Sequence, residues 1–125
     1  MQVSLVSSQF ITFLAYSPDG KHFVSADRNR YIYVWDNASK EVKNSGWQFH
    51  SAAVTSVDFS PNSEKLVSGS LDGSFIIWKD LKGYSKDRLT MENAHFGGVA
   101  CVSFIDNGMI VSSGDDRCVK FWNLK

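Results

Sequence analysis

A tryptophan recurs in the sequence at nearly constant spacing, and this repeat restricts the possible folds more than any other feature. Trp35, Trp78 and Trp122 are separated by 43 and 44 residues. Each of them closes a short segment rich in β-branched and aromatic residues: RYIYVW, GSFIIW and RCVKFW. Such a period is typical of chains built from similar units in series, in which each unit buries its apolar side chains against its neighbours.

Each unit contains further segments in the same order. A strand-like stretch (FITFLAY, AAVTSVDF or GVACVSF) leads into a turn (SPDG, SPNS or IDNG), and a second stretch (HFVSA, KLVSGS or MIVSSG) precedes the tryptophan segment. Pro, Asp, Asn and Gly suit these turns because they supply preset or positive φ angles. Weaker segments near residues 40–44 and 87–91 indicate a fourth strand between units.

Composition favours an all-β fold and argues against several classes of protein. The chain has 12 Val but 3 Glu, a balance that suits strands better than helices. Basic and acidic residues number 13 each with no basic cluster, so we expect no nucleic-acid partner. No apolar run is long enough to cross a membrane and no secretory signal is evident, so we expect a cytoplasmic location. Cys101 and Cys118 are expected to be buried thiols.

The second and third units also share a set of polar residues that resembles a catalytic triad. The sets are His50, Ser68, Asp72 and Trp78 in the second unit, and His95, Ser112, Asp116 and Trp122 in the third. One interpretation is a nucleophilic serine with its base and orienting carboxylate. The other is a structural polar relay, in which the indole N–H meets the serine, the serine meets the histidine, and the histidine meets the aspartate.

Spacing favours the structural relay over the triad. The same constellation occurs twice, whereas an enzyme needs one triad. A hairpin with its turn at Asp72 is expected to place Ser68 opposite Trp78 on one face of the sheet. Ser70 and Ser113 remain alternative hydroxyl partners.

The first unit lacks most of this constellation, and no other chemistry stands out. Ser7 and Asn29 occupy the histidine and aspartate positions, and only Ser25 and Trp35 match. The histidines and cysteines lack the paired short spacings of zinc sites, and no glycine-rich phosphate loop is present. We therefore predict no catalytic residue, no metal and no cofactor.

The residues of the repeated units resemble a known family. Units of this length with tryptophan in the third strand are similar to WD-repeat propeller blades. The stretch EVKNSGWQFHSAAVTSVDFSPNSEKLVSGSLDGSFIIW resembles the penultimate repeat of the actin-interacting protein one family, and NAHFGGVACVSFIDNGMIVSSGDDRCVKFWNL resembles its last repeat. The resemblance covers residues 35–125 well and residues 1–34 loosely.

The resemblance implies a partial β-propeller of three blades, each with four antiparallel strands, at about residues 7–44, 50–91 and 95–125, with the last blade lacking its outer strand. It also implies a non-enzymatic protein of the actin cytoskeleton, with actin and cofilin as partners in filament disassembly. A WD-repeat scaffold in another multiprotein complex is the alternative.

Three blades cannot close a ring, because propellers close with about 4–8 blades. Residues 3–6 are expected to form the outer strand of a preceding blade. The missing partner is then either the remaining blades of the same propeller in a longer protein, which we favour, or another copy of the chain. Trp47, in the segment GWQF, is a candidate partner-binding residue, because large aromatic residues in loops often anchor interfaces. The alternative is that Trp47 packs beneath its own loop.

Overall fold

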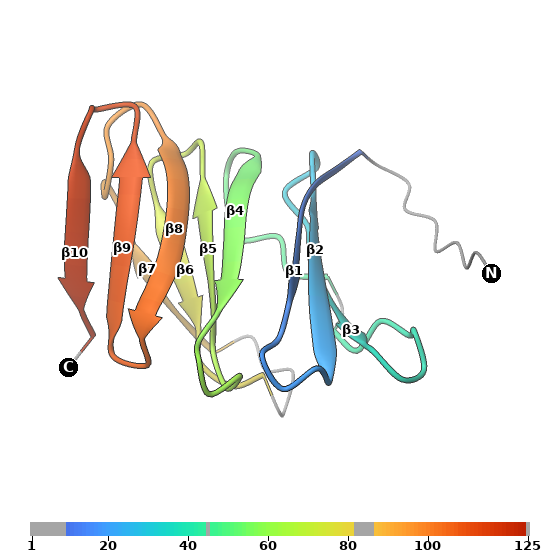
Figure 1. Cartoon of the computed structure of the whole chain (residues 1–125). Helices are drawn as coiled ribbons and strands as arrows, with labels where there is room; N and C mark the ends of the chain where they lie inside the picture. Colours follow the sequence, from blue (N-terminus) through green and yellow to red (C-terminus); the bar gives the residue numbers. More distant parts are fainter. Residues whose placement is uncertain (1–9, 45, 82–86, 125) are drawn as a thin grey trace.

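The computed structural model describes residues 10–44, 46–81 and 87–124, and these residues form strands, turns and loops without a helix. The strands form three antiparallel sheets, which stand side by side in chain order with the second sheet in the middle (Figure 1). The prediction of an all-β fold made of partial propeller blades is confirmed. We call the sheets blade one, blade two and blade three.

Each blade is a meander in which consecutive strands pair with one another. Blade one contains β1 (Ile11–Tyr16), β2 (His22–Asp27) and β3 (Ile32–Asp36). Blade two contains β4 (Val54–Phe59), β5 (Leu66–Ser70), β6 (Phe75–Trp78) and β7 (Arg88–Met91). Blade three contains β8 (Val99–Asp106), β9 (Met109–Gly114) and β10 (Val119–Asn123).

The fourth strand differs between the blades. In blade two the segment expected near residues 87–91 forms β7, which pairs with β6 along its length. In blade one, the segment after β3 forms only isolated bridges, one from Trp35 to Val42 and one from Ile32 to Trp47. In the described part of blade three, β10 is the last strand, and it pairs only with β9.

A side-chain amide completes the irregular edge of blade one. The backbone N–H of Val34 donates to Asn44 Oδ1 at 3.0 Å, and Asn44 Nδ2 donates to the carbonyl oxygen of Ile32 at 2.9 Å. Buried backbone polar groups need partners, and here the amide of Asn44 supplies what a peptide group of a fourth strand would supply. The chain around Asn44 can therefore depart from strand geometry without leaving β3 unpaired at these positions.

Two apolar cores lie between the blades. Successive side chains of a strand point to opposite faces, so each strand of the middle blade can serve both cores. On β5, Leu66 packs into the core shared with blade one, whereas Val67 packs into the core shared with blade three. All residues of β5 and β6 are buried, because neighbouring blades cover both faces of the middle blade.

Hydrogen bonds recur at equivalent positions between neighbouring blades. Thr12 Oγ1 donates to the carbonyl oxygen of Val54 at 3.1 Å, and Thr55 Oγ1 donates to that of Val99 at 2.7 Å. Asp58 Oδ2 accepts a backbone N–H of β8 at 2.8 Å. Because each bond joins a side chain of one blade to the backbone of the next, these bonds fix how the sheets are placed relative to one another.

Among the described residues, side chains on the two outermost blade faces are exposed. Leu14 and Tyr16 of β1, and Val119 and Phe121 of β10, are exposed. Cys101 lies on the uncovered face of blade three and is exposed, because it alternates along β8 with Val102, which packs towards blade two.

The expectation that both cysteines are buried is therefore wrong. Cys118, in the turn before β10, is exposed as well. Cys118 lies at the end of a blade, outside both inter-blade cores. Its thiol is therefore exposed although an apolar strand follows it.

Candidate functional site

Blade two contains a continuous chain of hydrogen bonds built on its central strands. Trp78 Nε1 donates to Ser68 Oγ at 3.1 Å. Ser68 Oγ lies 2.9 Å from His50 Nε2, and His50 Nδ1 lies 3.0 Å from Asp72 Oδ2. Four residues from the loop before β4, from β5, from the following turn and from β6 are thus joined in one relay.

Blade three repeats this arrangement with the same atoms. Trp122 Nε1 donates to Ser112 Oγ at 2.8 Å. Ser112 Oγ lies 2.7 Å from His95 Nε2, and His95 Nδ1 lies 2.8 Å from Asp116 Oδ1. In blade two the alternative hydroxyl is used elsewhere, since Ser70 Oγ donates to the carbonyl oxygen of a residue in the preceding loop.

The strand register differs from the expected one in a detail that matters for the relay. Ser68 pairs with Ile76, and Trp78 pairs with Leu66, so Ser68 and Trp78 are diagonal neighbours rather than opposite residues. Diagonal neighbours on one face are still within reach of a long aromatic side chain. The indole therefore crosses to the serine two positions along β5.

Blade one keeps only the first bond of the relay. Trp35 Nε1 donates to Ser25 Oγ at 2.9 Å. In the following turn, Asp27 Oδ1 accepts the backbone N–H groups of Asn29 and Tyr31 at 2.9 and 3.1 Å. The turn is thus held by its own aspartate, without a histidine. Ser7 lies outside the described residues.

Donor and acceptor capacities fix the direction of each relay. An indole N–H can only donate and a carboxylate can only accept. The serine oxygen therefore accepts from tryptophan, and histidine Nδ1 donates to aspartate. A neutral imidazole with its proton on Nδ1 then leaves Nε2 to accept the serine O–H, and every polar group of the relay is paired.

Burial makes the relay serines poor candidates for nucleophiles. Ser68 is 0% and Ser112 is 1% exposed, and each hydroxyl oxygen already accepts an indole N–H. A catalytic serine needs an open approach for the substrate carbonyl and a donor group for the developing oxyanion. The arrangement instead satisfies polar groups inside each blade and ties its loops to its strands.

The relay aspartates are held in their ionised form. Burial on its own would raise the pKa of Asp72, but hydrogen bonds from His50, from the side chain and backbone of Ser74, and from the backbone of Ser51 outweigh it and lower that pKa. The hydrogen bond from His95 is the main reason that the pKa of Asp116 is also lowered.

These lowered pKa values predict an acid-sensitive fold. The folded protein favours ionised Asp72, so this group stabilises the fold fully above its unfolded pKa of about 3.9 and loses that contribution as the pH falls below it. We expect Asp72→Asn to lower the free energy of unfolding at pH 7, and the difference from the wild type to be smaller at pH 3. Urea unfolding of both proteins at both pH values measures this difference. A difference of equal size at the two pH values would contradict this account. For Asp116→Asn we expect the same pattern, a loss of stability at pH 7 that becomes smaller at pH 3.

The relays organise one end of the sheets, which we call the relay end. It comprises the turns β5–β6 and β9–β10, at the upper end in Figure 1, and the loops that lead into β4 and β8. The backbone N–H of Ser51 donates to Asp72 Oδ2 at 3.0 Å, and that of His95 donates to the carbonyl oxygen of Gly73 at 3.1 Å. Each loop is thereby fixed to a turn of blade two.

Trp47 lies inside the protein and not on a partner-facing loop. Its side chain is 0% exposed, and its ring stacks on that of Trp78 with centroids 4.4 Å apart. Its Nε1 has no hydrogen-bond partner among the described residues. The loop folds back so that its largest ring covers the relay tryptophan, which agrees with the alternative of packing beneath its own loop. Phe49, two residues further on, is 41% exposed.

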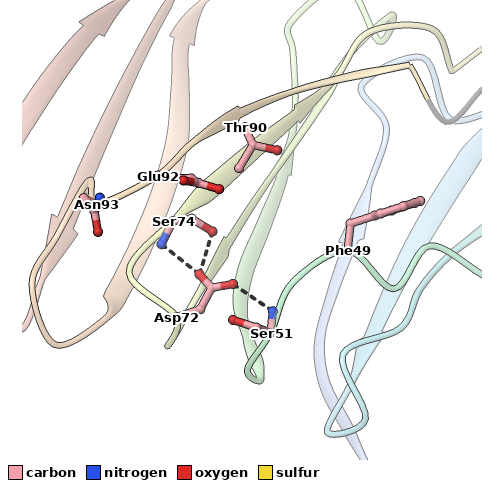
Figure 2. Close-up of a pocket in the computed structure, with 7 residues that line it drawn as sticks. All are labelled: Phe49, Ser51, Asp72, Ser74, Thr90, Glu92 and Asn93. Atoms are coloured by element: carbon pink, nitrogen blue, oxygen red, sulfur yellow. Dashed lines mark hydrogen bonds between the residues drawn. The ribbon is translucent and has the colours of Figure 1, made fainter.

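A pocket opens at the relay end beside this loop. Its volume is about 300 Å³, and we call it the Glu92 pocket. It is lined by Phe49, Ser51, Asp72, Ser74, Thr90, Glu92 and Asn93. Figure 2 shows the side chains of Asp72, Ser74 and Glu92 around the same space, with Phe49 on the far side.

Comparison with known proteins agrees with this geometry. The family described as WD domain, G-beta repeat matches residues 3–36, 42–79 and 86–123. These three matches cover most of the chain, one for each sheet. The chain belongs to the WD-repeat family.

Several relatives resemble all three WD repeats together. The chain is 47% identical to the 66 kDa stress protein of Physarum polycephalum over 93% of its own length. It is 42% identical to Actin-interacting protein 1-2 of Arabidopsis thaliana over 91%, and 35% identical to Actin-interacting protein 1 of Drosophila melanogaster over 92%. The WD-repeat chain spans 19% of the length of each of these relatives.

The sequence motifs indicate the relays of these WD repeats but not the Glu92 pocket. Arg88 and Thr90 alternate on β7, and exposed Glu92 follows in the turn after it. This pattern of exposed polar residues was the signal in the sequence that could have indicated the pocket. In the described segments, no cluster of three potential metal-ligating residues occurs. The same segments contain no helix with the length and apolar character needed to cross a membrane.

Proposed function

We propose that this chain is a non-catalytic, protein-binding part of an actin-binding protein that promotes cofilin-dependent filament disassembly in the cytoplasm. The observation that carries the proposal is the similarity, across all three blades, to proteins named for their interaction with actin. Similarity restricted to the repeat signature would have suggested only a WD-repeat scaffold.

The chemistry of the chain supports binding rather than catalysis. The hydroxyls that resemble nucleophiles are buried within their relays, whereas the relay end offers exposed loops, aromatic rings and carboxylates. WD-repeat blades present such loops on a rigid sheet scaffold, and rigid presentation lowers the entropic cost of binding a partner.

The uncovered faces of blades one and three support a further partner. Contiguous exposed apolar surface is unfavourable in water, and both faces carry exposed apolar side chains. We propose that further blades of the same propeller cover these faces. The alternative is that another copy of the chain covers them.

Co-sedimentation with actin filaments tests the proposed function. We expect the full chain to pellet with filamentous actin, and to pellet more completely when cofilin decorates the filaments. A sample without actin controls for self-sedimentation, and it should stay in the supernatant with and without cofilin. Pelleting that does not depend on actin would overturn the proposal and favour a WD-repeat scaffold in another complex.

A further inference from the structure

The described lining of the Glu92 pocket is negatively charged. Of its seven described lining residues, Asp72 and Glu92 are acidic and none is basic. The pocket also offers hydroxyl groups and one exposed aromatic ring. A cavity of this kind repels phosphates and carboxylates and favours a cationic group.

The two carboxylates differ in the number of hydrogen bonds that they already accept within the chain. Asp72 accepts hydrogen bonds from His50, from the backbone of Ser51, and from both the backbone and the hydroxyl of Ser74. Those bonds fill the usual acceptor positions of a carboxylate, so Asp72 contributes a fixed negative charge. Glu92 is exposed, and its side chain forms no hydrogen bond or ion pair with the rest of the described chain.

The aromatic wall already accepts a guanidinium group from the same chain. The Cζ atom of Arg88 lies 3.6 Å from the centroid of the Phe49 ring, which is within the range of cation–π contact. Phe49 also contacts the relay tryptophan, Trp78, with ring centroids 5.8 Å apart. Phe49 is therefore held in place at the pocket.

Exposed apolar residues lie next to the pocket in the same turn and loop. Leu71 precedes Asp72 and is 51% exposed, and Phe96 follows Asn93 in the loop before β8 and is 90% exposed. A Cβ on Gly98 would lie 3.2 Å from Leu71 Cα, so this loop packs directly on the turn. Neither apolar side chain is needed for the inter-blade cores, since neither belongs to them.

We propose that the Glu92 pocket binds an arginine side chain of a partner protein, with a neighbouring apolar residue of that partner resting on Leu71 and Phe96. Glu92 supplies the unpaired carboxylate for a charge-assisted hydrogen bond, and Asp72 supplies the fixed charge behind it. A planar guanidinium can donate two parallel hydrogen bonds to the Glu92 carboxylate, which a compact ammonium group cannot. This inference rests on the pocket itself and does not depend on actin being the partner.

A pair of matched peptides tests the proposal. The probes are acetyl-Leu-Arg-Leu-amide and the same peptide with citrulline, which keeps the shape of arginine without its charge. We expect the arginine peptide to shift the backbone amide NMR signals of Ser51, Ser74 and Glu92 in the full chain. It should bind about fivefold more tightly than the citrulline peptide, the factor expected for one exposed charge pair.

Substitutions at exposed positions separate the contributions of charge and apolar contact. Glu92→Gln should weaken binding of the arginine peptide about fivefold and leave the citrulline peptide unaffected. Glu41→Gln, an equally conservative change at an exposed position outside the pocket, should leave the affinity for both peptides unchanged. Phe96→Ser should weaken the binding of both peptides by the same factor.

Several outcomes would overturn the proposal. Equal binding of the arginine and citrulline peptides would do so, and this comparison needs only the wild-type chain. Signal changes confined to the turns at the opposite end of the blades would place the peptide elsewhere. Unchanged arginine binding in a correctly folded Glu92→Gln variant would exclude the assigned carboxylate.

Discussion

Replacing His50 with alanine is expected to lower the free energy of unfolding by about 3 kcal/mol. The ring is buried and hydrogen-bonds on both sides, to Ser68 and to Asp72. Its removal leaves a cavity and deprives two polar groups of a partner each, which places the change among the larger single-residue effects. Urea unfolding at pH 7, followed by tryptophan fluorescence, measures the loss.

His22→Ala provides the matched control for this experiment. His22 is only partly buried and lies on β2 of blade one, which has no histidine relay. We expect a loss of no more than about 1 kcal/mol there. Equal losses at the two histidines would mean that the relay adds nothing beyond ordinary packing.

Replacing Gly114 with alanine is expected to disrupt the blade three relay although every relay residue is retained. The added Cβ would lie 2.4 Å from the Cβ of His95 and 2.6 Å from the carbonyl oxygen of Gly98. Real Cβ atoms do not approach so closely, and the His95 ring is buried, so the ring must move away from Ser112. We expect the free energy of unfolding to fall by about 3 kcal/mol.

Two measurements separate this effect from ordinary glycine replacement. The imidazole NMR signals of His95 should change in Gly114→Ala, because its bonds to Ser112 and Asp116 are disturbed. Gly20→Ala is the control, since Gly20 has a φ of +73° and no atom within 4 Å of an added Cβ. It should cost about 1 kcal/mol through backbone strain alone and leave those signals unchanged. Unchanged His95 signals in Gly114→Ala would refute the displacement.

The strands and the relay partners were predictable from sequence for a physical reason. The recurring turns set strand lengths, and buried polar side chains have few ways to be satisfied. Once Trp78 and His50 were placed in one blade, a hydroxyl between them was required, and Ser68 and Ser70 were the candidates on β5. Deciding between these two serines required the register, which depends on the length of the β5–β6 turn and not on the motif.

Other features depend on how irregular segments fold back, which a motif does not encode. The segment around Trp47 has the composition of a surface loop, but the isolated bridge to Ile32 directs the tryptophan into the core. The same bridge and the amide of Asn44 replace the fourth strand that the period predicted for blade one. The Glu92 pocket is formed by residues from three separate segments, so no local pattern could indicate it.

The hydrogen bonds between blades have a consequence for how this chain is made. Those from Thr12 and Thr55 join residues separated by 42 and 44 positions, so each blade finds its partner as soon as the next repeat has been synthesised. Domains generally fold in order during synthesis, and here a nascent chain can add one blade at a time to a growing stack. However long that stack becomes, only its first and last faces meet water, so the surface prone to aggregation does not increase as synthesis proceeds.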